Sequence, residues 1–419
     1  MAEVLARRVP LETALSRQNG YDALASRDRA FARQIAATTL RRLGQIDGAL
    51  KPFVRQRPPN YVQAVLRTAA AQILFLGTPA HAAVGEAVAL LKSQPKIKGF
   101  SGMANAVLRR LVEKGPALAV AIAPQENIPV WLRRSWEKAY GRAAMRKMAL
   151  QLLETPPLDI TFKPDVSQEV RQSWAESLGD KLLPNGSVRS QVIGDVSLRA
   201  GYEDGTWWAQ DIAATLPVMI LGDVKGKRVL DMCAAPGGKT LQLAAGGADV
   251  TALDRSGSRL ERLYDNLKRT QLGATLIETD ALDYAPEGPL FDSVVLDAPC
   301  TATGTFRRHP DVLYNRQWED VAKLVRIQDA LFDKAVTLVR SGGEIVYCTC
   351  SLQPQEGEER ARHYLEKYKN LECVTIEPHP QFDLPDAAFA EGFFRTCPYF
   401  WAENGGMDGF FTARFRKTE

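Results

Sequence analysis

The chain has 419 residues, a hydrophobic fraction of 45% and a charged fraction of 24%. This length exceeds what one hydrophobic core usually serves, so two or three domains are expected and a single small module is excluded. The composition is that of a globular protein and excludes a disordered or fibrous chain. No run of about 18 apolar residues occurs, and the charged start lacks the apolar stretch of a signal peptide. We therefore expect a cytoplasmic protein with no membrane partner.

Cysteine and histidine usage argues against a cross-linked or metal-stabilised fold. The chain contains six Cys and four His, and no two cysteines form a Cys-x-x-Cys pair. Six cysteines in a chain of this length are too sparse for a disulfide scaffold. No metal site is expected either, because structural zinc requires clusters of such ligands.

The net charge of +4 is concentrated at one end of the chain. Residues 1–110 contain 17 Lys and Arg against 6 Asp and Glu, a local net charge of +11, so the remaining residues carry −7. A solvated helical surface is also rich in Lys and Arg. The asymmetry nevertheless favours a segment that neutralises RNA or DNA phosphates.

The first part of the chain has apolar residues at helical spacing, which predicts an all-α bundle over residues 1–125. The residues that carry this pattern are Phe31, Ile35, Leu43, Val62, Val65, Leu66, Ala69, Ile73, Val84, Val88 and Leu91. Residues 115–130 are predicted to be a linker, because Gly and Pro flank a short apolar run. A further helix is predicted from Trp131 to Leu153.

Short apolar runs mixed with Gly and Pro predict a small α+β connecting subdomain over residues 126–205. From residue 206 to residue 419, strand-like runs alternate with helical segments; the runs are RVLDMCA, ADVTALD, TLIETD, DSVVLDAPC and GGEIVYCTCS. Such alternation predicts a parallel sheet covered on both faces, a doubly wound, Rossmann-like α/β domain.

In a doubly wound sheet the ligand binds beyond the carboxyl ends of the strands. The strand that ends at Met232 leads into a loop of small residues, Cys233-Ala234-Ala235-Pro236-Gly237-Gly238-Lys239-Thr240. Small residues let the backbone approach a ligand where the next helix begins. A Walker A loop needs Gly five positions before Gly238, where this chain has Cys233. The loop therefore lacks the first glycine of a P-loop NTPase.

The next strand ends at Asp254, about 20 residues beyond the loop, where a carboxylate accepts hydrogen bonds from ribose hydroxyls. The Gly-x-Gly-x-x-Gly signature of a dinucleotide site is absent. An acidic residue alone is as often the cap of a following helix, here before Ser256. The loop and Asp254 together favour S-adenosylmethionine over a dinucleotide.

Taken together, these motifs resemble the Sun-type family of RNA cytosine-C5 methyltransferases. Four segments carry the resemblance in order: DMCAAPGGKT (231–240), LDAPCTATGTFRRHPD (296–311), GGEIVYCTCSLQPQEGEE (342–359) and MDGFF (407–411). Two further segments, PAHAAVGEAVALLK (79–92) and NAVLRR (105–110), resemble the NusB-type RNA-binding domain fused to the bacterial 16S rRNA member of that family. The resemblance implies S-adenosylmethionine as cofactor and RNA as partner.

Methylation of cytosine carbon 5 requires a nucleophile, because that carbon becomes electron-rich only after a thiolate attacks carbon 6. Cys300 and Cys350 lie at the predicted tips of two strands and can face one base. Analogy with DNA cytosine methyltransferases selects Cys300 as nucleophile, so the residues alone do not assign the roles. The family resemblance implies that Cys350 forms the covalent bond and that Cys300 helps to remove the carbon-5 proton and release product.

The resemblance also implies that Asp297 binds the N3 and amino edge of the cytosine and that Lys239 orients Asp297. Lys239 is also a candidate for the cation that lowers a thiol pKa. Cys348 is expected to be packing, and Arg307 and Arg308 are expected near phosphate. The residues expected at the cofactor are Cys233, Ala234, Ala235, Pro236, Gly237, Gly238, Lys239, Asp254, Arg259, Asp280, which would bind the adenine amino group, and Asp297.

The resemblance therefore implies a 16S rRNA cytosine-C5 methyltransferase that acts at cytosine 967 through a covalent Cys–C6 adduct, and we expect a monomer. Because a stacked base cannot reach Cys350, the target must be splayed or flipped into the pocket. A tRNA cytosine-C5 methyltransferase is the nearest alternative. A P-loop NTPase and a non-catalytic RNA-binding ribosome assembly factor are alternatives of different classes.

Overall fold

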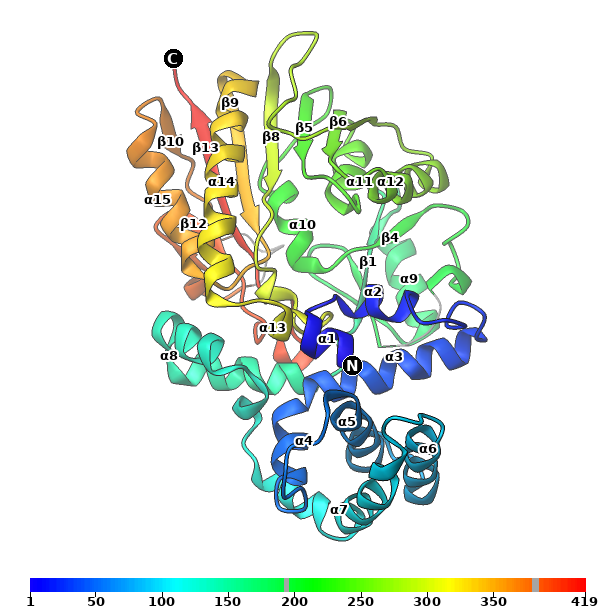
Figure 1. The fold of residues 1–419 in the computed structure, drawn as a ribbon. Coiled ribbons are helices and arrows are strands. Elements are labelled where there is room, and N and C mark those ends of the chain that lie inside the picture. The colour runs from blue at the N-terminus through cyan, green and yellow to red at the C-terminus, as the bar shows by residue number, and fades with distance from the viewer. Residues whose placement is uncertain (192–195, 379–383) are drawn as a thin grey trace. The chain divides into compact units, whose positions relative to one another are not determined.

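A computed structural model describes residues 1–191, 196–378 and 384–419. The chain forms two compact units, coloured by residue number in Figure 1. Unit 1 contains residues 1–155 and 306–317, and unit 2 contains residues 156–305 and 318–419. The three-part division at residues 125/126 and 205/206 stays a prediction.

Unit 1 is built almost entirely of helices, which confirms the predicted bundle. Its core consists of apolar residues from α4 to α7, including Ile46, Leu66, Leu108 and Leu111, which are all 1% exposed or less. The helices are α1 (Ala2–Arg7), α2 (Leu11–Ser16), α3 (Ser26–Arg41), α4 (Leu43–Leu50), α5 (Asn60–Phe75), α6 (Ala80–Lys92), α7 (Ser101–Ala121), α8 (Val130–Leu153) and α13 (Val312–Asn315), with short 3-10 turns η1 (Lys98–Phe100) and η2 (Pro124–Asn127).

The predicted linker over residues 115–130 is wrong in its first part. Helix α7 continues through Pro116 to Ala121, and η2 follows. The buried residues Leu111, Gly115 and Ala119 extend one face of the helix at spacings of four. A Cβ at position 115 would lie 3.0 Å from Leu74 of α5. Packing of this face therefore outweighs the local preference of Gly and Pro for a break.

Residues 306–317 belong to unit 1 although they follow Cys300 closely in sequence. The Tyr314 hydroxyl donates to the carbonyl oxygens of Leu40 (3.0 Å) and Asn127 (2.8 Å). The Phe306 ring stacks on Trp136 at 5.6 Å between ring centroids. The segment is thus integrated into the helical unit by buried hydrogen bonds and aromatic packing.

The predicted small α+β piece is present in unit 2. It is an antiparallel sheet of order β2-β3-β1-β4, with α9 packed against Ile160, Val188 and Trp207. A buried ion pair, Arg189 with Asp159 at 2.6 Å, joins β3 to β1. The elements are β1 (Leu158–Phe162), α9 (Gln168–Leu178), β2 (Lys181–Leu182), β3 (Val188–Ser190), η3 (Val196–Leu198) and β4 (Trp207–Ala209).

The main sheet of unit 2 confirms the predicted Rossmann-like class. Its order is β11-β12-β13-β9-β8-β5-β6-β7, with β10 paired to β13. The ladders among β5 to β9 are parallel, as predicted, whereas β10 to β13 add antiparallel pairs that the sequence did not indicate. The strands are β5 (Arg228–Met232), β6 (Asp249–Asp254), β7 (Thr275–Glu278), β8 (Phe291–Asp297), β9 (Val339–Thr349), β10 (Leu371–Cys373), β11 (Phe389–Ala390), β12 (Phe393–Arg395) and β13 (Phe411–Lys417).

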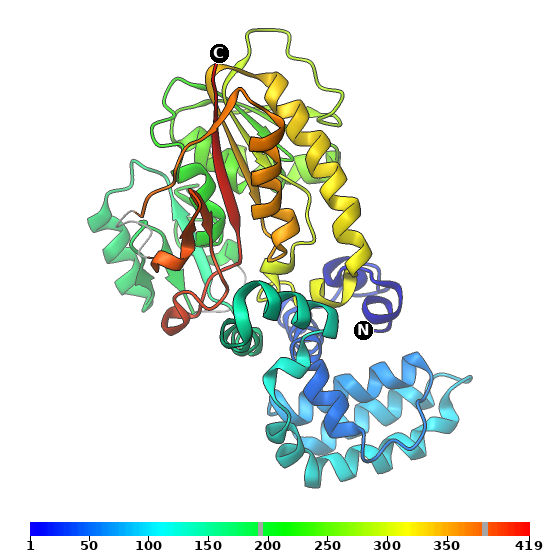
Figure 2. The ribbon, with the colours of Figure 1, turned by 90° about the vertical axis from the view of Figure 1, so that its left-hand side faces the viewer.

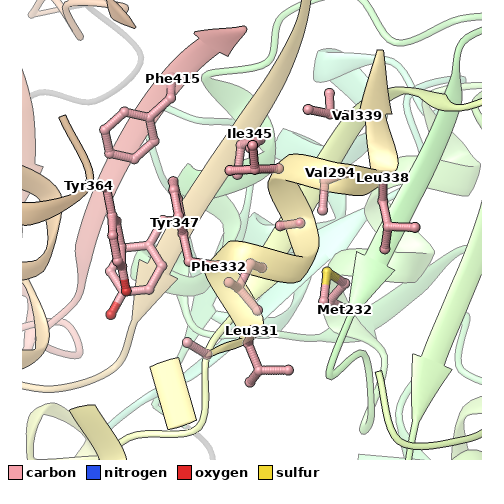
Figure 3. Packing of buried hydrophobic residues seen from close by; sticks show 14 of the residues in the cluster. Met232, Val294, Leu331, Phe332, Leu338, Val339, Ile345, Tyr347, Tyr364 and Phe415 are labelled. Atoms are coloured by element: carbon pink, nitrogen blue, oxygen red, sulfur yellow. The ribbon is translucent and has the colours of Figure 1, made fainter. Parts of the chain in front are cut away.

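Helices cover both faces of this sheet. Helices α14 (Trp318–Leu338) and α15 (Glu358–Lys367) lie side by side along one face (Figure 2). On that face Phe332 stacks on Tyr364 at 3.7 Å, beside Tyr347 and Phe415 (Figure 3). Helices α11 (Gly238–Ala245) and α12 (Gly257–Thr270) pack on the opposite face through Leu241 and Leu263, and α10 (Ile212–Met219) lies beside α11.

Candidate active site

The strand order reverses between β5 and β8. Strands β6 and β7 extend the sheet on one side of this pair, and β9 extends it on the other. Ligands of open α/β sheets bind at such a reversal, beyond the carboxyl ends of the strands. The loop at Cys233, the carboxylate of Asp297 and the thiol of Cys350 all follow the ends of β5, β8 and β9. The sheet therefore brings the three sequence motifs to one edge.

The loop between β5 and α11 comes very close to neighbouring side chains. Gly237 has φ +109°, and a Cβ there would lie 2.2 Å from Leu263 Cδ1 of α12. At Gly238 a Cβ would lie 3.1 Å from Gln210 Cδ. Gly237 is required both for its left-handed backbone and for this close packing. Small residues here leave backbone N–H groups close to the surface at the start of α11, as a cofactor cradle needs.

Asp254, at the end of β6, holds this loop. Its carboxylate accepts hydrogen bonds from the backbone N–H of Ala235 (3.1 Å) and of Ser256 (3.0 Å). Arg259 forms an ion pair with it at 3.3 Å and donates to the carbonyl oxygen of Ala235. Asp254 is thus more than the cap of the following helix. A carboxylate has about four acceptor sites, so these contacts leave capacity for a ribose hydroxyl.

Asp231 is a site residue that sequence reasoning missed. It is fully buried at the end of β5, where Thr240 donates to its Oδ2 at 2.6 Å. Its Oδ1 has no hydrogen-bond partner within the described ranges of the chain. Burial raises the pKa of this carboxyl to about 7. An acidic oxygen of this kind beside the loop fits the ammonium group at the amino-acid end of S-adenosylmethionine.

The other predicted cofactor residue, Asp280, lies in the turn that follows β7. Its side chain is exposed, and its Oδ1 accepts the backbone N–H of Leu282 at 3.0 Å. The strand β7 is the neighbour of β6, so Asp280 and Asp254 follow adjacent strand ends. The role of Asp280 at the adenine stays a prediction.

Lys239 and Asp297 form a partly buried ion pair, with 2.8 Å between Nζ and Oδ2. Burial opposes the lysine charge, but the Asp297 carboxylate and other negative neighbours outweigh it and raise the pKa of Lys239. The ammonium also lies 5.1 Å from the ring centre of Phe410, a favourable cation–π arrangement. Lys239 therefore stays charged and fixes one oxygen of Asp297.

Cys348 differs from its expected role as packing alone. It is the register partner of Asp297 on β9, and its Sγ lies 3.7 Å from Asp297 Oδ1. Burial, followed by the charge of Asp297, raises the pKa of this thiol well above its ordinary value. The protonated thiol donates to the oxygen of Asp297 that Lys239 does not bind. The contact arises because β8 and β9 are neighbours in the sheet. The position of Cys348 along β9 alone did not indicate it.

The two cysteines predicted to be catalytic meet at the ends of β8 and β9. Their Sγ atoms are 3.5 Å apart. Cys300 is 8% exposed, whereas Cys350 is half-buried. The hydrogen bond with Cys350, and after it burial, raises the pKa of Cys300 well above its ordinary value. Of the pair, Cys350 is the sulfur that an incoming base reaches more easily.

Arg307 does not lie where a phosphate contact requires it. Its side chain is 1% exposed and belongs to unit 1, with Arg41 as a charged neighbour. Burial and this neighbour lower the pKa of Arg41 to about 10. Arg308 is partly exposed. The aromatic and hydrogen-bonded packing of residues 306–317 explains why Arg307 is turned inward.

The described parts of the chain show neither a metal cluster nor a membrane span. They hold no group of three or more His, Cys, Asp or Glu side chains with metal-binding geometry. They also hold no helix whose length and apolar character would let it cross a bilayer.

The chain is similar to known proteins over most of its length. The family model for 16S rRNA methyltransferase RsmB/F matches residues 218–416, and the NusB family model matches residues 3–113. Ribosomal RNA small subunit methyltransferase B of Salmonella arizonae is 31% identical over 88% of this chain and 90% of its own length; its Escherichia coli O139:H28 counterpart has the same values. The crystal structure of PH0851 covers 99% of this chain and 97% of its own, with a TM-score of 0.78 and 23% identity. The structure of NSun6 from Pyrococcus horikoshii with SFG covers 70% and 98%, with a TM-score of 0.59 and 19% identity.

The fold, the small-residue loop and the paired strand-end cysteines define an S-adenosylmethionine-dependent methyltransferase with a NusB-type domain. The chain belongs to the RsmB/F family of 16S rRNA methyltransferases. The predicted family and cofactor are thereby confirmed. The individual roles of the site residues stay predictions.

Proposed function

We propose that this enzyme methylates carbon 5 of a cytosine in 16S rRNA, the one at position 967, through a covalent bond between Cys350 and carbon 6. The observation that carries the proposal is the pair of thiols whose sulfur atoms lie 3.5 Å apart. Cys300 follows β8, which ends at Asp297, and Cys350 follows the neighbouring strand β9. A single nucleophile explains one cysteine, but a second thiol beside it fits a reaction that must also remove a proton from the same ring.

The first step forms a bond between the Cys350 sulfur, as thiolate, and carbon 6 of the flipped cytosine. An electron pair of the ring then moves toward carbon 5. Asp297 accepts a hydrogen bond from the amino group, and a proton shared between its carboxyl group and N3 offsets the negative charge that develops on N3. Lys239 and Cys348 hold the two Asp297 oxygens from either side, so the carboxylate needs little rearrangement during the attack. When bound, S-adenosylmethionine supplies the electrophilic methyl group that carbon 5 captures.

The last step returns the enzyme to its starting state. Cys300, as thiolate, takes the proton from carbon 5. The carbon–hydrogen electron pair restores the ring double bond, and the bond between carbon 6 and Cys350 breaks, which regenerates the Cys350 thiolate. Cys300 then releases the proton to solvent. The contact with Cys350, and after it burial, raises the pKa of Cys300, so Cys300 rests as a thiol, and the thiolate that forms when its proton passes to solvent is a strong base.

The helical unit supports RNA as the substrate. Exposed basic side chains gather in the segment between α4 and α5 (Lys51, Arg55 and Arg57), at the end of α6 and just after it (Lys92, Lys96 and Lys98) and on α7 (Arg109, Arg110 and Lys114). Such groups displace condensed counterions when they meet phosphates. The relatives in Salmonella and Escherichia are named for ribosomal RNA of the small subunit. Action in the cytoplasm is part of the same proposal.

Bisulfite sequencing of rRNA and tRNA from a strain that lacks this gene tests the target. The proposal expects loss of one 5-methylcytosine in 16S rRNA, restored by the wild-type gene and not by a Cys350→Ala gene. Loss of a methylated cytosine in tRNA instead would establish the tRNA alternative. An unchanged methylation map, together with a ribosome assembly defect, would point to a non-catalytic assembly factor.

A further inference from the structure

Glu356 is a fully buried acid close to both catalytic cysteines. It ends the 3-10 turn η5 (Pro354–Glu356) that follows the Thr-Cys-Ser motif, and its exposure is 0%. No Lys or Arg side chain forms an ion pair with it in the parts of the chain that the structure describes. A buried carboxylate without a counter-ion is costly unless hydrogen bonds replace its hydration.

Hydrogen bonds to the Glu356 carboxylate come from residues next to both cysteines. Oε1 accepts from the backbone N–H of Thr301 at 2.9 Å and from Gln328 Nε2 at 3.1 Å. Oε2 accepts from the hydroxyls of Ser351, at 2.6 Å, and of Thr301. Thr301 directly follows Cys300, and Ser351 directly follows Cys350. One carboxylate therefore binds the residue that follows each sulfur-bearing residue.

The residues that precede the two cysteines are bound by Gln328 and by the backbone carbonyl of Glu356. Gln328 of α14 donates its amide to the carbonyl oxygen of Pro299 (2.9 Å) as well as to Glu356. The backbone carbonyl of Glu356 accepts from the hydroxyl of Thr349 at 3.2 Å and from that of Tyr347 at 2.8 Å. The network around Glu356 therefore binds the residues before and after Cys300 and those before and after Cys350.

The sheet cannot supply this constraint. The β8–β9 ladder ends at the pair Asp297 and Cys348, and the backbone N–H of Ala298 makes its last bond, to Cys348. The next backbone bond between the two loops joins Gly304 N–H to the carbonyl oxygen of Cys350. The turn that carries Cys300 lies between these bonds. Its hydrogen bonds to Glu356 and Gln328 hold it against the turn that carries Cys350, together with a direct contact between the hydroxyls of Thr301 and Ser351 at 2.9 Å.

We propose that Glu356 is a positioning residue that fixes the separation between the Cys300 and Cys350 sulfur atoms by binding the turns on which both are carried. The inference rests on the proposed function only because that function gives the two sulfurs a joint task. Its test measures how fast the two sulfur atoms form a disulfide, which requires no RNA. Methyl transfer is measured separately, so failure of one claim is distinguishable from failure of the other.

The rate of disulfide formation between Cys300 and Cys350, started with oxidised glutathione, reports how closely the two sulfur atoms are held. The Cys350 thiolate attacks the glutathione disulfide, forms a mixed disulfide and releases one glutathione thiolate. Cys300 then gives up its proton to solvent and attacks the Cys350 sulfur, which forms the Cys300–Cys350 disulfide and releases the second glutathione. The first-order rate of this ring closure, followed by mass spectrometry of quenched full-length protein, depends on how well the two sulfurs are held together.

In Glu356→Ala the closure rate is expected to fall at least tenfold, while Glu359→Ala, an exposed acid in α15, leaves it unchanged. Glu356 is one of the groups that raise the pKa of Cys300, after its bond with Cys350 and burial. Loss of the negative charge alone would therefore speed closure, so slower closure can arise only from lost positioning. Glu356→Gln, which keeps the shape and one acceptor, should recover part of the rate.

A closure rate in Glu356→Ala within twofold of that in Glu359→Ala would overturn the proposal. If Glu356→Ala does not fold, Gln328→Leu removes the donor that joins Glu356 to the carbonyl oxygen of Pro299 and leaves the direct contact between the Thr301 and Ser351 hydroxyls. It should slow closure severalfold, and an unchanged rate there would also overturn the proposal. Wild-type protein that closes rapidly but transfers no methyl group to any RNA would reject the proposed function and leave this inference standing.

Discussion

The two thiols that we propose to be catalytic differ in exposure, and their proposed tasks predict different phenotypes for their variants. Cys350→Ala should abolish methyl transfer, because the neighbouring thiol, Cys300, is buried and has a raised pKa, which make it a poor replacement as nucleophile. Cys300→Ala should still allow attack and methylation, but it should accumulate a covalent protein–RNA adduct because proton removal fails. Denaturing gels with labelled RNA measure both outcomes. Full activity in Cys350→Ala, with no adduct in Cys300→Ala, would show that the roles are wrongly assigned.

Asp231 predicts a pH-dependent change of stability. Its folded pKa of about 7 exceeds its ordinary value of 3.8, so between these values the folded chain binds the proton and the unfolded chain does not. Stability is therefore lost as pH rises through this window, by up to about 4 kcal/mol. Relative to wild type, Asp231→Asn should gain stability between pH 4 and pH 7.

Denaturant unfolding of the cofactor-free protein at several pH values measures this difference. Asp249→Asn is the matched control, because the Asp249 side chain is 70% exposed at the start of the neighbouring strand β6. The control should show no such trend. A difference between Asp231→Asn and wild type that is constant from pH 4 to pH 7 would contradict the buried, partly protonated state of Asp231.

At the scale of the element, the loop between β5 and α11 depends on the backbone of one glycine. Gly237→Ala places a Cβ 2.2 Å from Leu263 in a residue with φ +109°, so both the loop and α12 must shift. We expect at least a tenfold loss of S-adenosylmethionine affinity and a destabilisation of about 1–3 kcal/mol. Isothermal titration calorimetry measures the affinity. Gly273→Ala, with no atom within 4 Å of its Cβ, is the control, and equal affinities in the two variants would refute the role of the loop.

The local sequence pattern was enough to predict the parallel strands of the sheet and the convergence of the polar motifs at one of its edges. The apolar runs that end at Met232, Asp254 and Asp297 became β5, β6 and β8, and the polar motifs after them converged because parallel strands end at one edge. The antiparallel strands β10 to β13 were not predicted. Three of these four have only two or three residues, and the fourth, β13, gains its position from pairing with β9, some 60 residues earlier in the chain.

Contacts between elements explain what else the sequence could not show. Pro116 signals a break, yet the helix face that includes Leu111 and Ala119 continues because its partners bury it. Glu356 is one acid in a polar run, and only the approach of the two strand-end turns surrounds it with donors. Cys348 meets Asp297 only across the β8–β9 ladder. Each outcome depends on neighbours that are distant in sequence.

At the scale of the whole molecule, the basic charge of the helical unit predicts salt-dependent RNA binding. The triple variant Lys51→Gln, Arg55→Gln and Arg57→Gln should weaken RNA affinity and reduce the slope of log affinity against log salt by about 2, because each lost phosphate contact removes about 0.7–0.9. S-adenosylmethionine affinity should not change. Filter binding across a salt series measures the slope.

A matched triple variant in unit 2, with the exposed Lys225, Lys268 and Lys369 changed to Gln, removes the same charge from elsewhere. Its slope should stay close to that of wild type. If both triple variants lose the same slope, the RNA is attracted by the net charge of the molecule, and the helical unit has no special role in holding it.

The central claim is that the sulfur of Cys350 bonds to the pyrimidine ring during catalysis. An RNA substrate with 5-fluorocytosine at the target position, incubated with S-adenosylmethionine, blocks removal of the carbon-5 substituent and traps the adduct. Mass spectrometry of the crosslinked peptide should place the RNA on Cys350. A crosslink on Cys300 or another side chain, or active enzyme that forms no crosslink, would contradict the account.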